Sequence, residues 1–176
     1  MVRRGAHALR RTVYADLPCW RVPVTVLWRA DTFMKAALPM EQPISHHEAL
    51  VFAMVTMSAA DRTMTDAELR RIGEIVRIVP IFHDFDEERL VTLAETCGEI
   101  LQDDDGLDTI LDLIRTCLPE HLYETAYALA VEIAAADLRI QQEELRFLAM
   151  LRDRLGLEKL IVSAIERGAQ ARHRRL

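Results

Sequence analysis

One stretch of this chain occurs twice, and this internal duplication limits the possible fold more than any other feature. Residues 48–70 align with residues 124–146 without a gap. In each copy an apolar run ends in Ala-Ala-Asp, a four-residue segment follows, and an amphipathic run begins. We therefore expect each copy to be a helix, a tight loop and a second helix. The identical positions are Glu48, Val55, Ala59, Ala60, Asp61, Glu68, Leu69 and Arg70, with their counterparts 76 residues later.

The duplication continues into a third helical segment in each copy. Residues 88–94 resemble residues 158–164, at a separation of 70, so the second copy has the shorter connection. Apolar residues recur at helical spacing, and no strand pattern is present. We expect an all-α fold, a seven-helix bundle of two three-helix pseudo-repeats joined by a connector helix. The expected helices are 46–60, 66–79, 87–101, the connector 107–117, 119–136, 141–155 and 157–167.

Two segments, 49–60 and 126–136, are apolar on nearly all sides. A helix without a polar face is buried rather than surface-lying. We therefore expect the helices that carry these segments to form the central pair of the bundle. In the helix over 141–155 the residues expected to be buried are Leu145, Leu148, Leu151 and Leu155.

Short local patterns mark where the helices begin and end. A hydroxyl residue followed three positions later by Glu predicts a capping box, in which each side chain accepts a backbone N–H of the other residue. Asp86 is expected to cap the third helix, and Gly156 and Gly168 to end the last two. Residues 169–176 are expected to fray. The predicted capping boxes are Ser45 with Glu48 and Thr65 with Glu68.

The loop of each copy resembles the signature of the TerB-like (tellurite-resistance) family. That signature is a helix ending in small residues, then Asp-Gly-x-apolar-x-x-x-Glu, then a second helix. The chain reads ADRTMTDAE over residues 60–68 and ADLRIQQEE over residues 136–144. The resemblance covers roughly residues 44–167. It departs from the signature at Arg62 and Leu138, which stand where the family has glycine, and either residue is strained if that position has a positive φ.

Four carboxylates in the two loops form the strongest candidate site: Asp61 and Glu68, with Asp137 and Glu144. Hard divalent cations such as calcium, magnesium or manganese take oxygen ligands of this kind, and zinc is a further candidate. The resemblance implies the same role for the acidic loop residues. A structural role is the alternative, because Asp at a helix end and Glu in a first turn both satisfy backbone N–H groups.

The ligand count favours the structural role, since two carboxylates in each loop are few for a site built from protein alone. The second loop complicates that interpretation. Gln141 stands where the first copy has Thr65, and Gln is a poor N-cap, so Glu144 is harder to explain by capping alone.

Several other polar groups have a plain explanation. Glu132 interrupts an apolar helix, and we expect it to pair with an arginine or to reach solvent rather than join the acidic loops. Residues 103–106 read Asp-Asp-Asp-Gly but lack the spacing of a calcium loop, so a capped helix start is expected. His46, His47 and His83 are expected to be exposed residues, because adjacent side chains on a helix point to different faces.

Charge is unevenly distributed along the chain. Residues 44–166 hold 25 acidic and 11 basic residues, a net charge of −14, whereas residues 1–39 hold seven basic and two acidic ones. An acidic domain repels phosphate backbones, which argues against nucleic-acid binding by that domain. Three cysteines without close pairing indicate a reduced, cytoplasmic protein, with no disulfide between Cys97 and Cys117.

The first 43 residues differ from the rest and are treated as a basic N-terminal extension. Four prolines interrupt them, and their apolar patches are too short for a membrane span or a secretory signal. Three interpretations stay open. The segment is a flexible basic arm, a membrane-surface segment around Trp20 and Trp28, or a mis-assigned start with the protein beginning at Met34 or Met40.

Three functions follow from these patterns. The first is a non-enzymatic TerB-like domain over residues 44–168, with a basic tail over 169–176, that binds another protein in a metal or tellurite stress response under control of a cation. The second is a plain helical adaptor whose loop acids are structural. The third, a carboxylate-metal enzyme, is disfavoured because no Glu-x-x-His pair is present.

Overall fold

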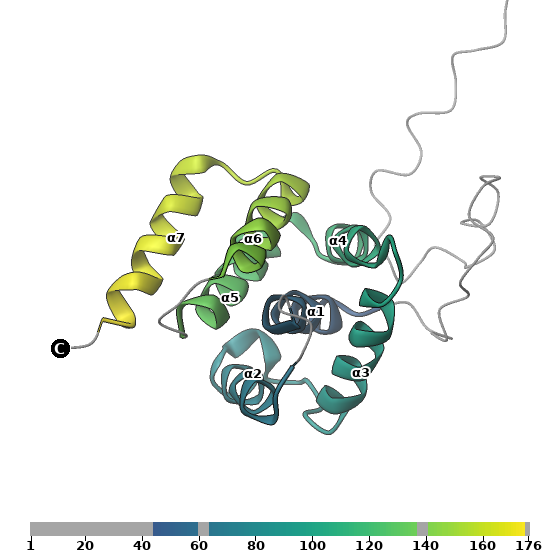
Figure 1. Ribbon diagram of the computed structural model, residues 1–176. Coiled ribbons are helices and arrows are strands. Elements are labelled where there is room, and N and C mark those ends of the chain that lie inside the picture. The colour runs from purple at the N-terminus through teal and green to yellow at the C-terminus, as the bar shows by residue number, and fades with distance from the viewer. Residues whose placement is uncertain (1–43, 60–63, 137–140, 175–176) are drawn as a thin grey trace, which may run out of the picture. The chain divides into compact units, whose positions relative to one another are not determined.

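The computed structural model describes residues 44–59, 64–136 and 141–174. This part of the chain is all-α, with seven α-helices, two short 3-10 helices and no strand (Figure 1). The predicted fold class and number of helices are therefore confirmed. The α-helices are α1 (His46–Ser58), α2 (Asp66–Ile78), α3 (Arg89–Leu101), α4 (Gly106–Cys117), α5 (Tyr123–Ala136), α6 (Gln142–Leu155) and α7 (Lys159–Arg172), and the 3-10 helices are η4 (Pro80–Phe82) and η5 (Glu120–Leu122).

Helix α1 is the centre of the described domain. Every residue from His47 to Ser58 is buried, and α2 to α6 all contact the helix. Figure 1 shows α1 nearly end-on, with α2, α3, α4 and α5 around it. Its contact with α5 is the most extensive between any two described helices, which confirms the predicted central pair. Each large apolar side chain buried here contributes about 1.5–3 kcal/mol of transfer free energy, so α1 stabilises the fold by burial on all sides.

Both predicted capping boxes form. The hydroxyl of Ser45 accepts from the backbone N–H of Glu48 at 3.2 Å, and the Glu48 carboxylate accepts from the N–H of Ser45 at 2.6 Å. Glu48 is itself buried, and Arg89 at the start of α3 donates to its second oxygen. The cap of α1 thus also holds α3, a contact that the local pattern did not predict.

The two halves pair their helices in the same way. In each half the first helix packs on the third, α1 on α3 and α5 on α7. Thr56 on α1 lies 3.5 Å from Cys97 on α3, and Glu132, 76 residues after Thr56, contacts Arg172 and His173 at the end of α7. This parallel is compatible with the duplicated sequence. The pseudo-repeat itself stays a prediction, as do the predicted domain boundaries.

The C-terminal helix is longer than expected. Helix α7 continues through Gly168 to Arg172, and Ala169 is buried, so the prediction that Gly168 ends the helix and residues 169–173 fray is wrong. The cause is Glu132, which accepts from the Arg172 guanidinium and lies 2.7 Å from Nε2 of His173. Two side-chain contacts at the last turn offset the low helix propensity of glycine.

Helix α6 is rotated slightly from the predicted orientation. Leu148, Leu151 and Leu155 are buried as expected, but Leu145 is 53% exposed and the prediction for it is wrong. Phe147 is buried in its place. A larger aromatic side chain removes more apolar surface from water than leucine does, so it decides which face turns inward.

No described helix has both the length and the apolar character needed to cross a membrane.

Candidate functional site

The predicted site residues lie at the two corners where a first helix is followed by a second. Asp61 and Asp137 lie outside the described residues. Glu68 is in the first turn of α2, and Glu144 is in the first turn of α6. The structure therefore describes one of the two candidate carboxylates at each corner.

Glu68 is held by the capping box of α2. Its Oε2 accepts from the backbone N–H of Thr65 at 2.6 Å and from the Thr65 hydroxyl at 2.9 Å. The N–H of Glu68 in turn donates to the Thr65 hydroxyl oxygen at 3.3 Å. Both bonds to the carboxylate use the same oxygen, and Oε1 accepts no hydrogen bond from a residue in the described ranges. Capping fixes the position of Glu68 and leaves one oxygen for another role.

Glu144 occupies the same position at the second corner. Its Oε2 accepts from the backbone N–H of Gln141 at 2.6 Å, the same length as the bond at the first corner. Capping therefore accounts for Glu144 in spite of the poor N-cap residue before it. The two corners are alike in this bond and differ in the side chain that completes the cap.

Ser58 distinguishes the first corner. It lies in the last turn of α1, three positions before Asp61, and is 7% exposed. Its hydroxyl oxygen has no hydrogen-bond partner within the described part of the chain. A buried hydroxyl left without a partner costs about 1–3 kcal/mol, so this oxygen needs a partner that the described residues do not supply. The equivalent residue of the second copy is Ala134, which offers no such group.

The described residues do not by themselves form a metal site. Among them, no group of three or more His, Cys, Asp or Glu side chains is arranged to hold an ion. Glu68 and Glu144 are thus not brought together with a third described ligand. A cation at either corner depends on Asp61 or Asp137, or on water, to complete its coordination.

The histidines at the start of α1 differ from the prediction. The ring centroids of His46 and His47 lie 3.9 Å apart with the ring planes tilted by 50°, and His47 is only 9% exposed. The His47 ring lies between His46 and the rings of Phe82 and Phe85, each 5.9 Å away. His46 is exposed, as predicted, but the prediction of exposure is wrong for His47, because the chain around η4 covers this end of α1.

His47 has a structural role. Its Nε2 lies 2.8 Å from the carbonyl oxygen of Ile81 and 3.4 Å from Oδ1 of Asp84. A carbonyl oxygen can only accept, so Nε2 carries the proton and is not a free metal ligand. Burial lowers the pKa of the neighbouring His46, as do the charges of His47 and His121, against an opposing effect of Asp84.

Glu132 pairs with an arginine, as predicted, and does not join the acidic corners. Its side chain is 27% exposed. Burial alone raises the pKa of Glu132, but hydrogen bonds from Arg172 and His173, together with their charges, outweigh burial and lower it below the usual value. The carboxylate is therefore ionised at neutral pH and already satisfied.

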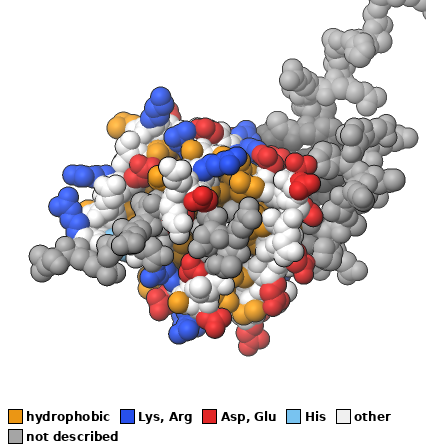
Figure 2. Space-filling view, in the orientation of Figure 1, with side chains coloured by type: hydrophobic (Ala, Val, Ile, Leu, Met, Phe, Trp, Pro, Cys, Tyr) orange, Lys and Arg blue, Asp and Glu red, His pale blue; other side chains and the backbone are white. Residues whose placement is uncertain are grey.

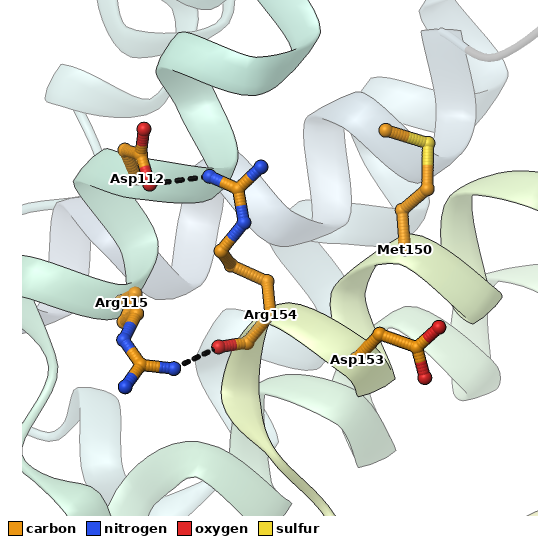
Figure 3. Close-up of a pocket in the computed structure, with 5 residues that line it drawn as sticks. All are labelled: Asp112, Arg115, Met150, Asp153 and Arg154. Carbon is orange, nitrogen blue, oxygen red and sulfur yellow. Dashed lines mark hydrogen bonds and ion pairs between the residues drawn. The ribbon is translucent and has the colours of Figure 1, made fainter.

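A shallow hollow between α4 and α6 is a structural link rather than a binding site. Figure 3 shows the Arg154 guanidinium pointing from α6 to Asp112 on α4, and Arg115 pointing to the Arg154 carbonyl. Asp108 binds the same guanidinium. Two carboxylates neutralise this arginine, so it has little charge left for an anion. Sequence reasoning missed the cluster; the signal was the pair of aspartates four positions apart on one face of α4.

The acidic run before α4 makes no side-chain cap. Asp105 occupies the N-cap position of α4, but its side chain accepts no hydrogen bond there. The predicted capped start is therefore wrong in this detail, although α4 does begin at Gly106. The Cβ of any other residue at position 106 would lie 2.0 Å from the Ile100 carbonyl oxygen, so glycine is required by the close approach of α3.

Cys97 does not supply a nucleophile to this site. No disulfide joins Cys97 to Cys117, in agreement with the prediction. Burial raises the pKa of Cys97 to about 12, against a smaller opposing effect of the hydrogen bond with Thr56. A thiol with that pKa is almost entirely protonated at neutral pH and is a poor nucleophile.

The fold and the corners define an all-α domain with an acidic residue fixed in the first turn after each central helix. The family model described as "Tellurite resistance protein TerB" matches residues 47–167, which is more than half of the chain. This chain therefore belongs to the TerB family, and the resemblance predicted from the two loops is confirmed. Searches of curated proteins and of solved structures found no match.

Proposed function

We propose that this chain is a non-enzymatic domain of a tellurite or metal stress response that binds another protein under control of a divalent cation. Membership of the TerB family supports the link to tellurite resistance. The observation that carries the proposal is the likeness of the two corners. In each, a glutamate accepts the N–H of the residue three positions earlier at 2.6 Å, which fixes a carboxylate beside an acidic loop.

The proposed mechanism is a change of charge and order at the corners. A cation bound by Asp61 and Glu68, or by Asp137 and Glu144, would neutralise carboxylates and fix the loop between two helices. A partner that contacts the ordered loop would then bind more tightly in the presence of the ion. Thermodynamic linkage requires the partner to raise the affinity for the ion by the same factor.

The first corner is the better candidate for the ion. It has the unsatisfied Ser58 hydroxyl, and Oε1 of Glu68 accepts no hydrogen bond from a described residue. The second corner has Ala134 in place of Ser58. We therefore expect Asp61→Asn to weaken cation binding more than Asp137→Asn does.

Calcium, magnesium, manganese and zinc are the ions proposed, since carboxylate oxygens bind all of them. The partner we propose is a protein, because a net charge of −14 over residues 44–166 repels nucleic acid. The proposed compartment is the cytoplasm. Contact of residues 1–43 with a membrane surface stays a prediction.

A plain helical adaptor is the second candidate. Its support is specific, because backbone caps engage both Glu68 and Glu144 and the described residues contain no three-ligand group. In this alternative the corner acids only stabilise the starts of α2 and α6, and no ion affects partner binding.

Thermal unfolding of the full chain, with and without each of the four ions, separates the two candidates. A ligand that binds only the folded state adds about 2.7 kcal/mol of stability at a concentration 100 times its Kd, so we expect a rise in Tm with at least one ion. Asp61→Asn combined with Asp137→Asn should abolish the rise. Asp103→Asn combined with Asp104→Asn is the matched control, because it makes the same charge change at exposed sites away from the corners.

Three outcomes are decisive. No rise in Tm with any ion supports the plain adaptor. A rise that survives the double Asp→Asn change at the corners places the ion elsewhere. A rise that the exposed control also abolishes shows general charge screening rather than a site.

A further inference from the structure

We propose that the groove between α2 and α3 holds a basic amphipathic helix of the partner protein. This inference rests on the proposed protein-binding function and assigns that binding to the surface between α2 and α3. It is carried by the shape and apolar floor of the groove, by a glycine that the fold does not require, and by the charges along the rim.

The groove has an apolar floor. Leu69 and Gly73 of α2 line one side, and Leu90 and Val91 of α3 line the other. Leu90 is 7% exposed and belongs to the core, whereas Val91 is 52% exposed and Leu69 is half-buried. An exposed valine beside a half-buried leucine offers an anchor point for an apolar side chain from outside.

Gly73 deepens the floor at a cost in stability. Glycine in the interior of a helix costs about 0.8–1.0 kcal/mol relative to alanine. A Cβ at this position would lie 3.6 Å from Cδ2 of Leu90, which is an ordinary contact, so the packing of α2 on α3 does not require glycine. The residue 76 positions later, on α6, is Ala149. Gly73 is itself buried, so the missing methyl group leaves the floor beside Leu90 lower than the packing of the domain requires.

The arginines of the groove are already engaged. Arg77 donates from Nε to Glu87 at 2.7 Å and joins α2 to the turn before α3. Arg70 donates from Nε to the backbone carbonyl of Asp66 at 3.1 Å. Within the described ranges, the carboxylates of Asp66 and Glu74 on the same rim form no ion pair. A hydrogen bond to a carbonyl leaves the charge of Arg70 in place, so the three carboxylates and two arginines that line the groove give it a net charge of −1.

The surface beyond the groove has the same sign. The exposed acids on or near α3 include Glu88, Glu95 and Glu99, whereas Arg89 is bound to the buried Glu48. In Figure 2 acidic side chains gather towards the side of α3 and α4, and basic ones are more frequent towards the side of α7. A partner that is apolar along one face and basic along its flanks matches both the floor and the rim.

A helix is the form of partner that suits a groove between two helices. An amphipathic helix presents apolar side chains at positions i, i+3, i+4 and i+7 along one stripe, with polar residues on either side. One of these apolar residues would lie over Gly73 and another against Val91. Lysine or arginine on the flanks of the partner helix would reach Asp66 and Glu74. The methylene chain of each side chain would lie along the apolar floor.

The test uses a synthetic amphipathic peptide of about 18 residues, with leucine at helical i, i+3, i+4 and i+7 spacing and lysine or arginine elsewhere. Its control is a peptide of the same composition in shuffled order. Binding to the full chain is measured by fluorescence anisotropy at physiological salt and in EDTA. The amphipathic peptide should bind more tightly than the shuffled peptide. We expect Val91→Glu to weaken that binding about tenfold or more, and Leu160→Glu, at a residue 78% exposed on α7, to leave it unchanged.

Gly73→Ala should change stability and peptide binding in opposite directions, which a purely structural role of Gly73 cannot produce. Alanine fits the space and suits a helix, so the variant should unfold at a higher temperature than the natural chain while binding the amphipathic peptide more weakly. A variant that is more stable and binds equally well contradicts the proposal.

Four other results would overturn the proposal. Equal binding of the shuffled peptide, or equal losses from Val91→Glu and Leu160→Glu, shows non-specific attraction. Equal weakening by Glu74→Lys and by Asp104→Lys shows the same. Self-association of the chain alone in sedimentation, abolished by Val91→Glu, makes a second copy the occupant. Peptide binding is measured in EDTA, which removes divalent ions, so it is independent of the test with ions. If the peptide binds but no ion raises Tm, only the proposed control by a cation is contradicted. If an ion raises Tm but the peptide does not bind, only the groove is contradicted.

Discussion

The two halves use different chemistry at one equivalent position. Thr56 is buried, and its hydroxyl lies 3.5 Å from the buried Cys97 sulfur, a weak contact. Glu132 stands 76 residues later and accepts from Arg172 and His173. Bonds to charged groups are stronger than neutral ones, so one carboxylate holds the end of α7 where the first half relies on packing.

Replacement of Glu132 should loosen α7. We expect Glu132→Gln to lower the free energy of unfolding at pH 7 by about 1 kcal/mol, because solvent partly screens the contacts with Arg172 and His173. Urea unfolding followed by circular dichroism measures the change. Glu124→Gln is the control on the same helix, since Glu124 is exposed, and it should change stability by no more than about 0.5 kcal/mol.

The pH dependence of this difference has a definite sign. The pKa of Glu132 is lowered from the ordinary value of 4.5. The stabilisation is therefore fully present above pH 4.5 and is lost as the pH falls through the folded-state pKa. The natural chain and Glu132→Gln should converge in stability below pH 4.5. A constant difference down to the lowest pH at which the chain folds would contradict the ionic origin of the contact.

The histidines at the start of α1 show how one covered residue changes its neighbour. His47 is enclosed by Phe82 and Phe85 and bound to the Ile81 carbonyl. The ring of His46 lies against it at a tilt, and burial is the main cause that lowers the pKa of His46. A neutral ring is the stable form next to a helix N-terminus, whose dipole disfavours positive charge.

At the scale of elements, the turn between α6 and α7 depends on a left-handed residue. Gly156 has a φ of 68° and ends α6, as predicted. No atom lies within 4 Å of a Cβ built there, so backbone strain alone decides the effect of a substitution. This turn aligns α7 along α5, because it fixes the direction in which the chain leaves α6.

A pair of glycine substitutions separates backbone strain from packing. Gly156→Ala should destabilise the chain by about 1–2 kcal/mol, the cost of a left-handed residue with a side chain. Gly98→Ala should stabilise it by about 0.5–1 kcal/mol, since Gly98 lies inside α3 with nothing within 4 Å of its Cβ direction. Chemical unfolding of both variants measures the difference. Equal effects of the two substitutions would show that the φ of Gly156 has no energetic consequence.

Polar contacts between helices supplement the apolar core. Arg154 joins α6 to α4 through Asp108 and Asp112, and the Tyr127 hydroxyl of α5 donates to Glu166 of α7 at 2.8 Å. Burial and the bonded Glu166 carboxylate raise the pKa of Tyr127, so the phenol stays a donor over the whole physiological range. These contacts select which helix faces meet, while burial supplies most of the stability.

At the scale of the whole molecule, charge repulsion is the main electrostatic feature. Residues 44–166 carry 25 acidic and 11 basic residues. Several described ion pairs, such as Arg152 with Asp153 and Arg77 with Glu87, lie at the surface and contribute little individually. Repulsion among the excess carboxylates is therefore larger than the attraction within the ion pairs, and salt screens both.

Added salt should stabilise the chain. We expect Tm to rise between about 10 mM and 150 mM sodium chloride, as the Debye length falls from about 30 Å to about 8 Å. The same rise is expected for Asp61→Asn combined with Asp137→Asn, because screening acts on all exposed carboxylates. Magnesium or calcium chloride at equal ionic strength should raise Tm further only in the natural chain. A fall in Tm with sodium chloride would show that ion pairs, rather than repulsion, dominate.

Local interactions explain what could be predicted of the fold and the site. The helices, the capping boxes at Ser45 and Thr65 and the stop at Gly156 all depend on residues within four positions of one another. The positions of Glu68 and Glu144 in the first turns of α2 and α6 follow from the same local rules. The pairing of α1 with α5 could also be predicted, because a helix without a polar face has to be buried.

The sequence by itself therefore determined the helices, most of their ends, the central pair and the family, through short-range patterns and apolar periodicity. Only the tertiary structure decided the burial of His47, the exposure of Leu145, the link from Arg154 to α4 and the extension of α7 to Arg172. Each of these depends on side chains that lie tens of positions apart and meet only after packing. A local pattern has no information about such a partner, and chain packing supplies it.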